Sequence, residues 1–165
     1  MRVGYKTRTI ILTVILIGCL SGCSGSGEQA NIPENRLAFY QVLNSEKPFI
    51  SANEDCREFY WNEYHWHDGT WTTSFTIYDF MLVDMDGDQE EEMILTGAMP
   101  ETTQVLDYQE GEVYSYQFPY RGMKGILVNG VYNTSSAADI GGFYRIHFDK
   151  GTYEEERLAY MEHDY

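Results

Sequence analysis

The sequence has few basic residues, few cysteines and no apolar run long enough to span a bilayer comfortably. Only 11 Lys and Arg stand against 26 Asp and Glu among 165 residues, which gives a net charge of −15. A chain this acidic repels phosphate backbones, so its composition argues against a nucleic-acid partner. Two of the three cysteines, Cys19 and Cys23, lie near the N-terminus, which leaves Cys56 without a disulfide partner in the rest of the chain.

Motifs for nucleophilic or phosphate chemistry are also missing. The sequence has no Gly-x-Ser-x-Gly motif, no phosphate-binding glycine loop and no cysteine–histidine signature. A carboxylate pair for glycoside hydrolysis stays open as an alternative, because any two of the many acids can face each other across a cleft. The sequence therefore favours a non-enzymatic role over an enzyme that acts on an envelope polymer.

The first part of the chain has the pattern of a targeting segment. Basic residues precede the short apolar run 10–17, which is typical of a secretory signal peptide and too short for a membrane span. Leu20-Ser21-Gly22-Cys23 follows and resembles the lipobox of bacterial lipoproteins, in which cleavage occurs before a cysteine that carries diacylglycerol. Leu16-Ile17-Gly18-Cys19 is a weaker second match. We predict that residues 1–22 are a lipoprotein signal peptide and that Cys23 carries the lipid.

The predicted lipid would hold a folded domain at the outer face of the cell membrane. Residues 23–31 contain a Ser-Gly repeat that predicts a flexible tether, and residues 32–165 are expected to form one extracytoplasmic domain. Hydrophobic residues make up 43% of the chain and aromatic residues 15%, which is enough to form a core. Acyl chains such as palmitate would anchor it. An uncleaved anchor and a soluble secreted product are the alternatives.

The residue pattern predicts a short helix followed by strands. A helix is expected from Pro33 to Leu43, with Leu37, Tyr40 and Leu43 along one face. In the second half of the chain, runs of β-branched and aromatic residues alternate with turns, and Asn129-Gly130 predicts a type I′ hairpin. The expected fold class is α+β, mainly one antiparallel β-sheet meander with a short N-terminal helix after the signal peptide.

The segment from residue 84 to residue 92 is the place where the sequence predicts a specific chemistry. Acidic residues recur there at alternate positions around Gly87, between two strand-like segments. Ca²⁺ takes about six to eight oxygens, and alternate residues of a tight loop can direct that many inward. The predicted ligands are the carboxylates of three aspartates, a backbone carbonyl at the seventh position and a carboxylate at the ninth: Asp84, Asp86, Asp88, Glu90 and Glu92.

Other interpretations of these polar and aromatic clusters stay open. The acids can decorate an exposed turn for solubility alone, although six of them within nine residues repel one another without a counter-ion. The cluster His65-Trp66-His67-Asp68, expected in a loop, can bind Zn²⁺ only if a third ligand such as His147 or His163 joins it. Exposed aromatic residues can stack on glycans, although β-sheets favour Tyr in any case.

Several motifs after Tyr78 occur in the same order in a known family. Val83 to Glu92 is similar to a "VDLDGDGxPE" turn and Val105 to Tyr116 to a "VLxYxxGxVYGY" hairpin, and later segments match "FxYRAM", "DGTFxxSSGAxDxGF" and "YxxxxLAYxE". On these motifs the chain resembles a family of uncharacterised lipoproteins from clostridia and related Gram-positive bacteria, with an acidic turn like those of FG-GAP repeats and EF-hands. Gln89 stands where the family has Gly, and Glu91 replaces Pro. The resemblance implies membrane localisation and a single domain, and no particular activity.

We therefore expect a lipid-anchored cell-envelope protein with a binding or structural role, stabilised by Ca²⁺ as a structural cofactor. Its expected partners are the membrane, through the N-terminal lipid, and a cell-wall glycan or an envelope protein. The alternative function is that of an enzyme that acts on an envelope glycan with a carboxylate pair.

Overall fold

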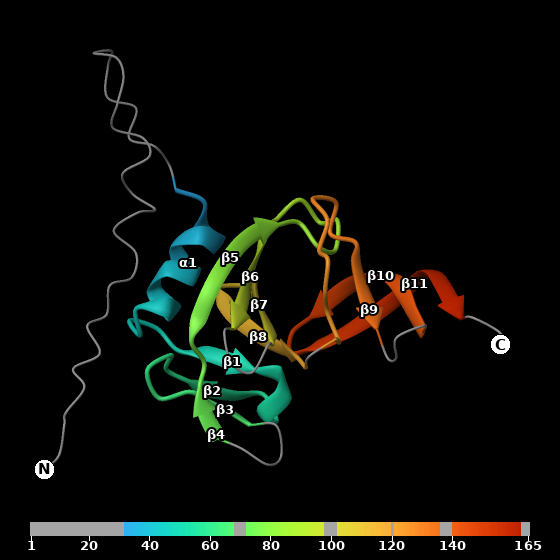
Figure 1. Cartoon of the computed structure of the whole chain (residues 1–165). Coiled ribbons are helices and arrows are strands. Elements are labelled where there is room, and N and C mark those ends of the chain that lie inside the picture. The colour runs from blue at the N-terminus through green and yellow to red at the C-terminus, as the bar shows by residue number, and fades with distance from the viewer. Residues whose placement is uncertain (1–31, 68–71, 98–101, 120, 136–139, 163–165) are drawn as a thin grey trace, which may run out of the picture. The chain divides into compact units, whose positions relative to one another are not determined.

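A six-stranded sheet and a three-stranded sheet form the two main β-layers of the structure (Figure 1). The structure is a computed structural model, and it describes residues 32–67, 72–97, 102–119, 121–135 and 140–162. The predicted signal peptide, the tether and Cys23 lie outside the described residues. Within the described part of the chain, no helix is long and apolar enough to cross a membrane.

The six-stranded sheet has the strand order β2-β1-β8-β7-β6-β5. Consecutive strands from β5 to β8 pair antiparallel, whereas β1 pairs parallel with β8. The strands of this sheet are β1 (Phe49–Ser51), β2 (Arg57–Phe59), β5 (Ile77–Val83), β6 (Glu92–Gly97), β7 (Thr103–Gln109) and β8 (Glu112–Phe118).

Two smaller sheets and two helices complete the described structure. The three-stranded sheet has the antiparallel order β11-β10-β9, and β3 pairs with β4 in a short ribbon. Their bounds are α1 (Glu34–Leu43), the 3₁₀ helix η2 (Ala52–Glu54), β3 (His65–His67), β4 (Thr72–Ser74), β9 (Tyr132–Ser135), β10 (Ile140–Asp149) and β11 (Thr152–Glu162).

The six-stranded sheet is covered on both faces. The face toward the three-stranded sheet, called the inner face below, belongs to a core of Val83, Met85, Ile94, Val105, Tyr116, Phe118, Met123, Tyr132, Ile146 and Phe148. The opposite face packs against α1 and aromatic side chains, in a core of Ala38, Phe39, Val42, Phe49, Tyr64, Met93, Leu95, Leu106 and Val113. Successive strand residues point to opposite faces, so adjacent apolar residues of β6 and β7 supply both cores.

The predicted α+β class is confirmed, and β5 to β8 form an antiparallel meander, but the strands do not all lie in one sheet. The structure divides its strands among three sheets, and the early strand β1 returns to pair with β8 through Ile50 and Tyr114. Turn residues encode pairing between strands that follow each other closely in the chain. They do not encode a parallel pairing across more than sixty residues, so the sequence pattern missed it.

The helix lies where the sequence predicts it but buries a different face. Leu37 is 44% exposed, whereas Ala38, Phe39 and Val42 are buried. Apolar residues occur on nearly every side of this short helix, so periodicity alone does not choose the buried face. Packing against the aromatic core around Phe49 decides it.

Two local predictions are also wrong. Residues 65–67 form strand β3 rather than a loop, because they pair with β4. The Asn129-Gly130 turn has a positive φ of 76° at Gly130 only, so it is not a type I′ turn, and it closes a single bridge between Lys124 and Asn133 rather than a hairpin of two strands. Strand β9 pairs with β10 instead.

Candidate metal centre

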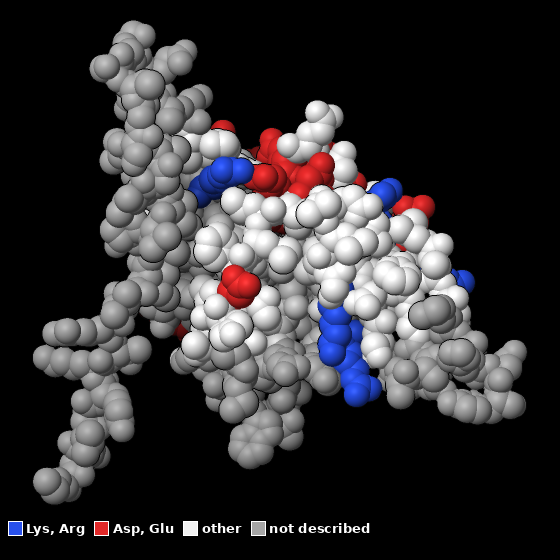
Figure 2. All heavy atoms as spheres, turned by 45° about the horizontal axis from the view of Figure 1, so that its top comes forward, with Lys and Arg blue, Asp and Glu red and all other residues white. Residues whose placement is uncertain are grey.

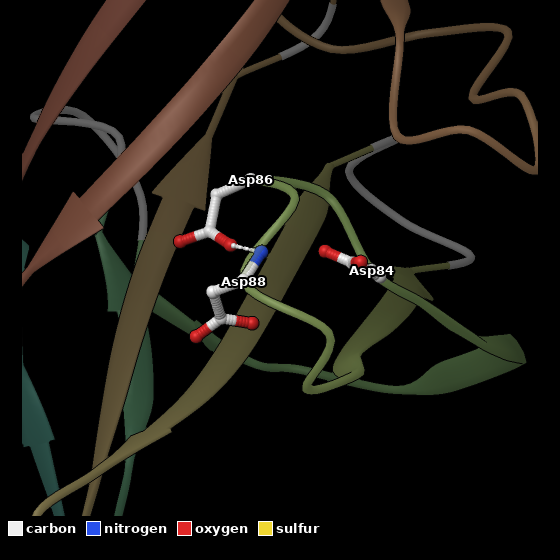
Figure 3. Close-up of side chains that lie close together, drawn as sticks. All are labelled: Asp84, Asp86 and Asp88. Carbon is white, nitrogen blue, oxygen red and sulfur yellow. Dashed lines mark hydrogen bonds between the residues drawn. The ribbon is translucent and has the colours of Figure 1, made fainter.

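The turn between β5 and β6 is built by aspartate side chains that accept backbone hydrogen bonds. The two carboxylate oxygens of Asp84 accept from the N–H groups of Gly87 at 2.7 Å and Gln89 at 3.2 Å. Asp86 accepts from Asp88 N at 3.1 Å, as the dashed line in Figure 3 shows. The carboxylate of Asp88 accepts a hydrogen bond from the backbone N–H of Glu90 at 2.7 Å. These bonds direct the three side chains into one turn.

The three aspartates converge closely enough to hold a single cation. One carboxylate oxygen from each of Asp84, Asp86 and Asp88 lies within 4.8 Å of the other two. Figure 3 shows Asp84 pointing into the turn from its first residue, toward the other two side chains. Two oxygens bound to one Ca²⁺ at about 2.3–2.6 Å lie at most about 5 Å apart, so the observed spacing fits one ion.

Two residues of the turn, Gly87 and Gln89, have a positive φ angle. Gly87 has a φ of 88°, in the region that glycine adopts without steric cost. Gln89 has a φ of 76°, in the left-handed region that side chains disfavour. The turn therefore adopts its shape at this position at some cost in conformational strain.

The other two predicted ligands, Glu90 and Glu92, do not belong to this cluster of carboxylates. The side chain of Glu90 is exposed, and its backbone N–H donates to Asp88. Glu92 is only 2% exposed and accepts a hydrogen bond of 2.6 Å from Met85 N. The structure therefore brings three of the predicted carboxylates together and places that of Glu92 in the protein interior behind the turn.

A buried acid that sequence analysis did not select lies beside Glu92. Asp107 on β7 is 4% exposed, and its Oδ2 atom has no hydrogen-bond partner among the described residues. The register pairs Met93 with Leu106, and one further step places Glu92 opposite Asp107 on the inner face. An acid in the middle of the apolar run of β7 was the signal that could have revealed it.

Burial and mutual repulsion raise the pKa values of these acids. Burial is the main cause that raises the pKa of Glu92 to about 9; the Met85 N–H lowers it, and the charges of Asp86, Asp107 and Asp88 raise it. Burial likewise raises the pKa of Asp107 to about 7, with further contributions from the charges of Asp86 and Asp88. The pKa of Asp86 itself is raised, mainly by burial. Without a bound cation, the three aspartates of the turn concentrate negative charge at this site.

No protein-family model, curated protein or solved structure matches this chain. The resemblance to clostridial lipoproteins therefore stays a prediction.

An ion pair lies at the end of the acidic turn. Figure 2, in which the top of Figure 1 is turned forward, shows a patch of acidic side chains with a basic side chain beside it. Arg36 of α1 donates from Nε to Glu91 at 3.0 Å, so it neutralises the end of the turn rather than the aspartates. All three members of the aspartate cluster offer oxygen, which is the donor type that hard divalent cations prefer.

The alternative Zn²⁺ site at the histidines lies only partly within the described residues. His65 and His147 are exposed on β3 and β10, while Asp68 and His163 lie outside the described part of the chain. The cluster that the structure assembles from His, Cys, Asp and Glu within the described residues consists of the three aspartates.

Proposed function

We propose that this chain is a lipid-anchored, extracytoplasmic envelope domain whose β5–β6 turn binds Ca²⁺ and is stabilised by it. The cation has a structural role, and the domain serves as a binding or structural module. Its partners are the membrane, through an acylated Cys23, and a cell-wall glycan or envelope protein.

The convergence of the three aspartates is the observation that carries the calcium part of this proposal. Each of them already accepts backbone N–H groups, so the carboxylates are oriented before an ion arrives. An oriented site loses little side-chain entropy on binding. The cation also offsets the repulsion that raises the pKa of Glu92 and Asp107.

The donor set favours Ca²⁺ over other common cations. Zn²⁺ prefers nitrogen and sulfur ligands, which are absent from this cluster. Mg²⁺ demands near-ideal octahedral geometry at about 2.0–2.1 Å and dehydrates reluctantly. Ca²⁺ accepts more ligands in looser arrangements, which suits an irregular turn.

The enzymatic alternative needs a carboxylate pair that is open to a cleft. A groove of about 660 Å³ has no acid among its described lining residues, which include Tyr78, Arg121 and Lys124. A hollow beside α1 is lined by three acids, Glu34, Glu90 and Glu91. Glu34 accepts from the Tyr108 hydroxyl and Glu91 pairs with Arg36, so two of the three are engaged in structural contacts, and we favour the structural role.

Ca²⁺ will raise the melting temperature of the full-length chain in detergent. Extracellular calcium modules have Kd values of about 10⁻⁴–10⁻³ M, and an ion at ten times its Kd adds about 1.4 kcal/mol of stability. This corresponds to a rise of about 3 to 8 °C, which circular dichroism will measure. Asp86→Asn removes one charge of the cluster and will abolish most of the rise. Mg²⁺ at the same concentration will have a smaller effect.

Asp55→Asn provides the control for this experiment. Asp55 is exposed, and its φ of 54° is one that Asn tolerates. This variant will keep the full response to Ca²⁺. Melting curves of the unmutated chain that coincide in Ca²⁺ and in chelator would show that the turn is only a solvated acidic loop.

Cys23→Ala will release the chain from the membrane. The lipobox-like segment ends at Cys23, and cleavage and acylation both require the thiol of that residue. Mass spectrometry of the membrane fraction will find an acylated peptide that begins at Cys23 in the unmutated protein and not in the variant. Cys19→Ala is the matched control and will be processed normally. Identical processing of Cys23→Ala and the unmutated chain would contradict the predicted anchor.

A further inference from the structure

Asp107 occupies a position at which β7 has no structural need for an acid. The strand directs Val105 and Asp107 to the inner face, where the neighbouring core residues are apolar. The Tyr108 backbone N–H and the side chain of Gln109 lower the pKa of this carboxyl, but burial outweighs them. Its Oδ2 atom is buried without a hydrogen-bond partner among the described residues. A buried, unpartnered carboxylate oxygen is costly unless a ligand uses it.

The position of Asp107 suggests that its unpartnered oxygen binds the same cation as the acidic turn. One row of residues crosses the inner face: Val83 pairs with Glu92, and Asp107 pairs with Tyr114. Residues opposite each other on neighbouring strands have Cβ atoms about 4.5–5.5 Å apart, and like charges there destabilise the sheet. Glu92 and Asp107 thus place two acids side by side, directly behind the turn that starts after Val83.

Electrostatics connect Asp107 to the aspartate cluster. The charges of Asp86 and Asp88 raise its pKa in addition to the effect of burial. The same two charges, together with that of Asp107, act on Glu92. Asp107 and Glu92 therefore both lie close enough to the exposed cluster to be influenced by its charges.

We propose that Asp107 is a further ligand of the cation held by the β5–β6 turn, and that it supplies the buried wall of the site together with Glu92. This inference rests on the proposed function, because it requires that the turn binds a cation. It adds a ligand from a different hairpin. The ion then ties the β5–β6 turn to strand β7, rather than ordering the turn by itself.

Calcium titration of the full-length chain in detergent, at constant ionic strength and pH 8, tests this proposal. Isothermal titration calorimetry of Asp107→Asn will show a Kd for Ca²⁺ at least about tenfold weaker than that of the unmutated chain. In chelator, the melting temperature of the same variant will be equal to or higher than that of the unmutated chain, because a buried charge has been removed. A merely structural Asp107 would lower the melting temperature in both conditions and leave the Kd unchanged.

The outcomes separate this inference from the function on which it rests. Asp55→Asn will bind as the unmutated chain does, and Asp86→Asn will bind more weakly. If the unmutated chain takes up no Ca²⁺, the proposed function fails and this inference fails with it. If the unmutated chain binds and Asp107→Asn binds equally well, the inference alone is overturned. Asp107→Ser is a second variant in case the first does not fold, and it will also bind more weakly.

Discussion

In chelator, the free energy of unfolding will fall as the pH rises from 6 to 8.5, and saturating Ca²⁺ will remove most of this dependence. The pKa of Glu92 is raised to about 9 and that of Asp107 to about 7 in the folded state. The unfolded chain has lost both protons by about pH 5, whereas the folded protein still holds them. Raising the pH therefore removes protons from the folded state only, and stability falls.

The size of this effect follows from the number of protons involved. One extra proton held by the folded state lowers the free energy of unfolding by about 1.4 kcal/mol per pH unit. Over the range from pH 6 to 8.5 the loss is about 3.5 kcal/mol, which urea unfolding at several pH values will measure. Bound Ca²⁺ replaces the protons at the carboxylates, so the holo protein will lose far less.

The variant Glu92→Gln tests whether Glu92 causes the pH dependence of the free energy of unfolding. The amide oxygen of Gln can still accept the Met85 N–H, but the side chain no longer titrates. The charges that face Glu92 come from Asp86 and Asp88 of the turn and from Asp107 of β7. The slope in chelator will therefore decrease in Glu92→Gln and stay unchanged in Asp55→Asn. A free energy of unfolding that rises from pH 6 to 8.5 would contradict the assignment.

The candidate site could be predicted from sequence only as far as it is local. Asp84, Asp86 and Asp88 lie within five residues of one another, so a tight turn around Gly87 was enough to bring them together. Asp107, the further ligand that we propose, lies on β7, which pairs antiparallel with β6. Which acid of a second strand faces the first depends on register, and register follows from the packing of both cores rather than from the turn.

The difference between local and long-range contacts also explains which parts of the fold could be predicted. The strands from β5 to β8 follow one another through short connections, and their pairing was predictable from alternating residues and turns. The pairing of β1 with β8 and the division into separate sheets depend on contacts between distant segments. Asn129-Gly130 is a local turn signal that also makes a tertiary contact, because Gly130 lies against the backbone of Asp84 and Met85.

Gly130→Ala will be strongly destabilising because Gly130 touches that turn through its backbone. A Cβ atom there would lie 2.6 Å from the Asp84 carbonyl oxygen and 2.6 Å from both the Cα and the carbonyl oxygen of Met85. The residue is also buried and has a φ of 76°. Backbone atoms cannot rotate away as a side chain can, so the two segments must separate. The expected loss is about 3 kcal/mol or more, from conformational strain and overpacking together.

Gly87→Ala is the matched control for this substitution. Gly87 has a similar φ of 88°, but a Cβ atom there meets no other heavy atom within 4 Å. Its expected loss is only the conformational strain of about 1–2 kcal/mol. Urea unfolding of both variants in chelator will compare them without the contribution of a bound ion, and Gly130→Ala will have the lower midpoint by a clear margin. Equal midpoints would show that the contact between residue 130 and the acidic turn does not hold the two segments together, since the strain at the two glycines is alike.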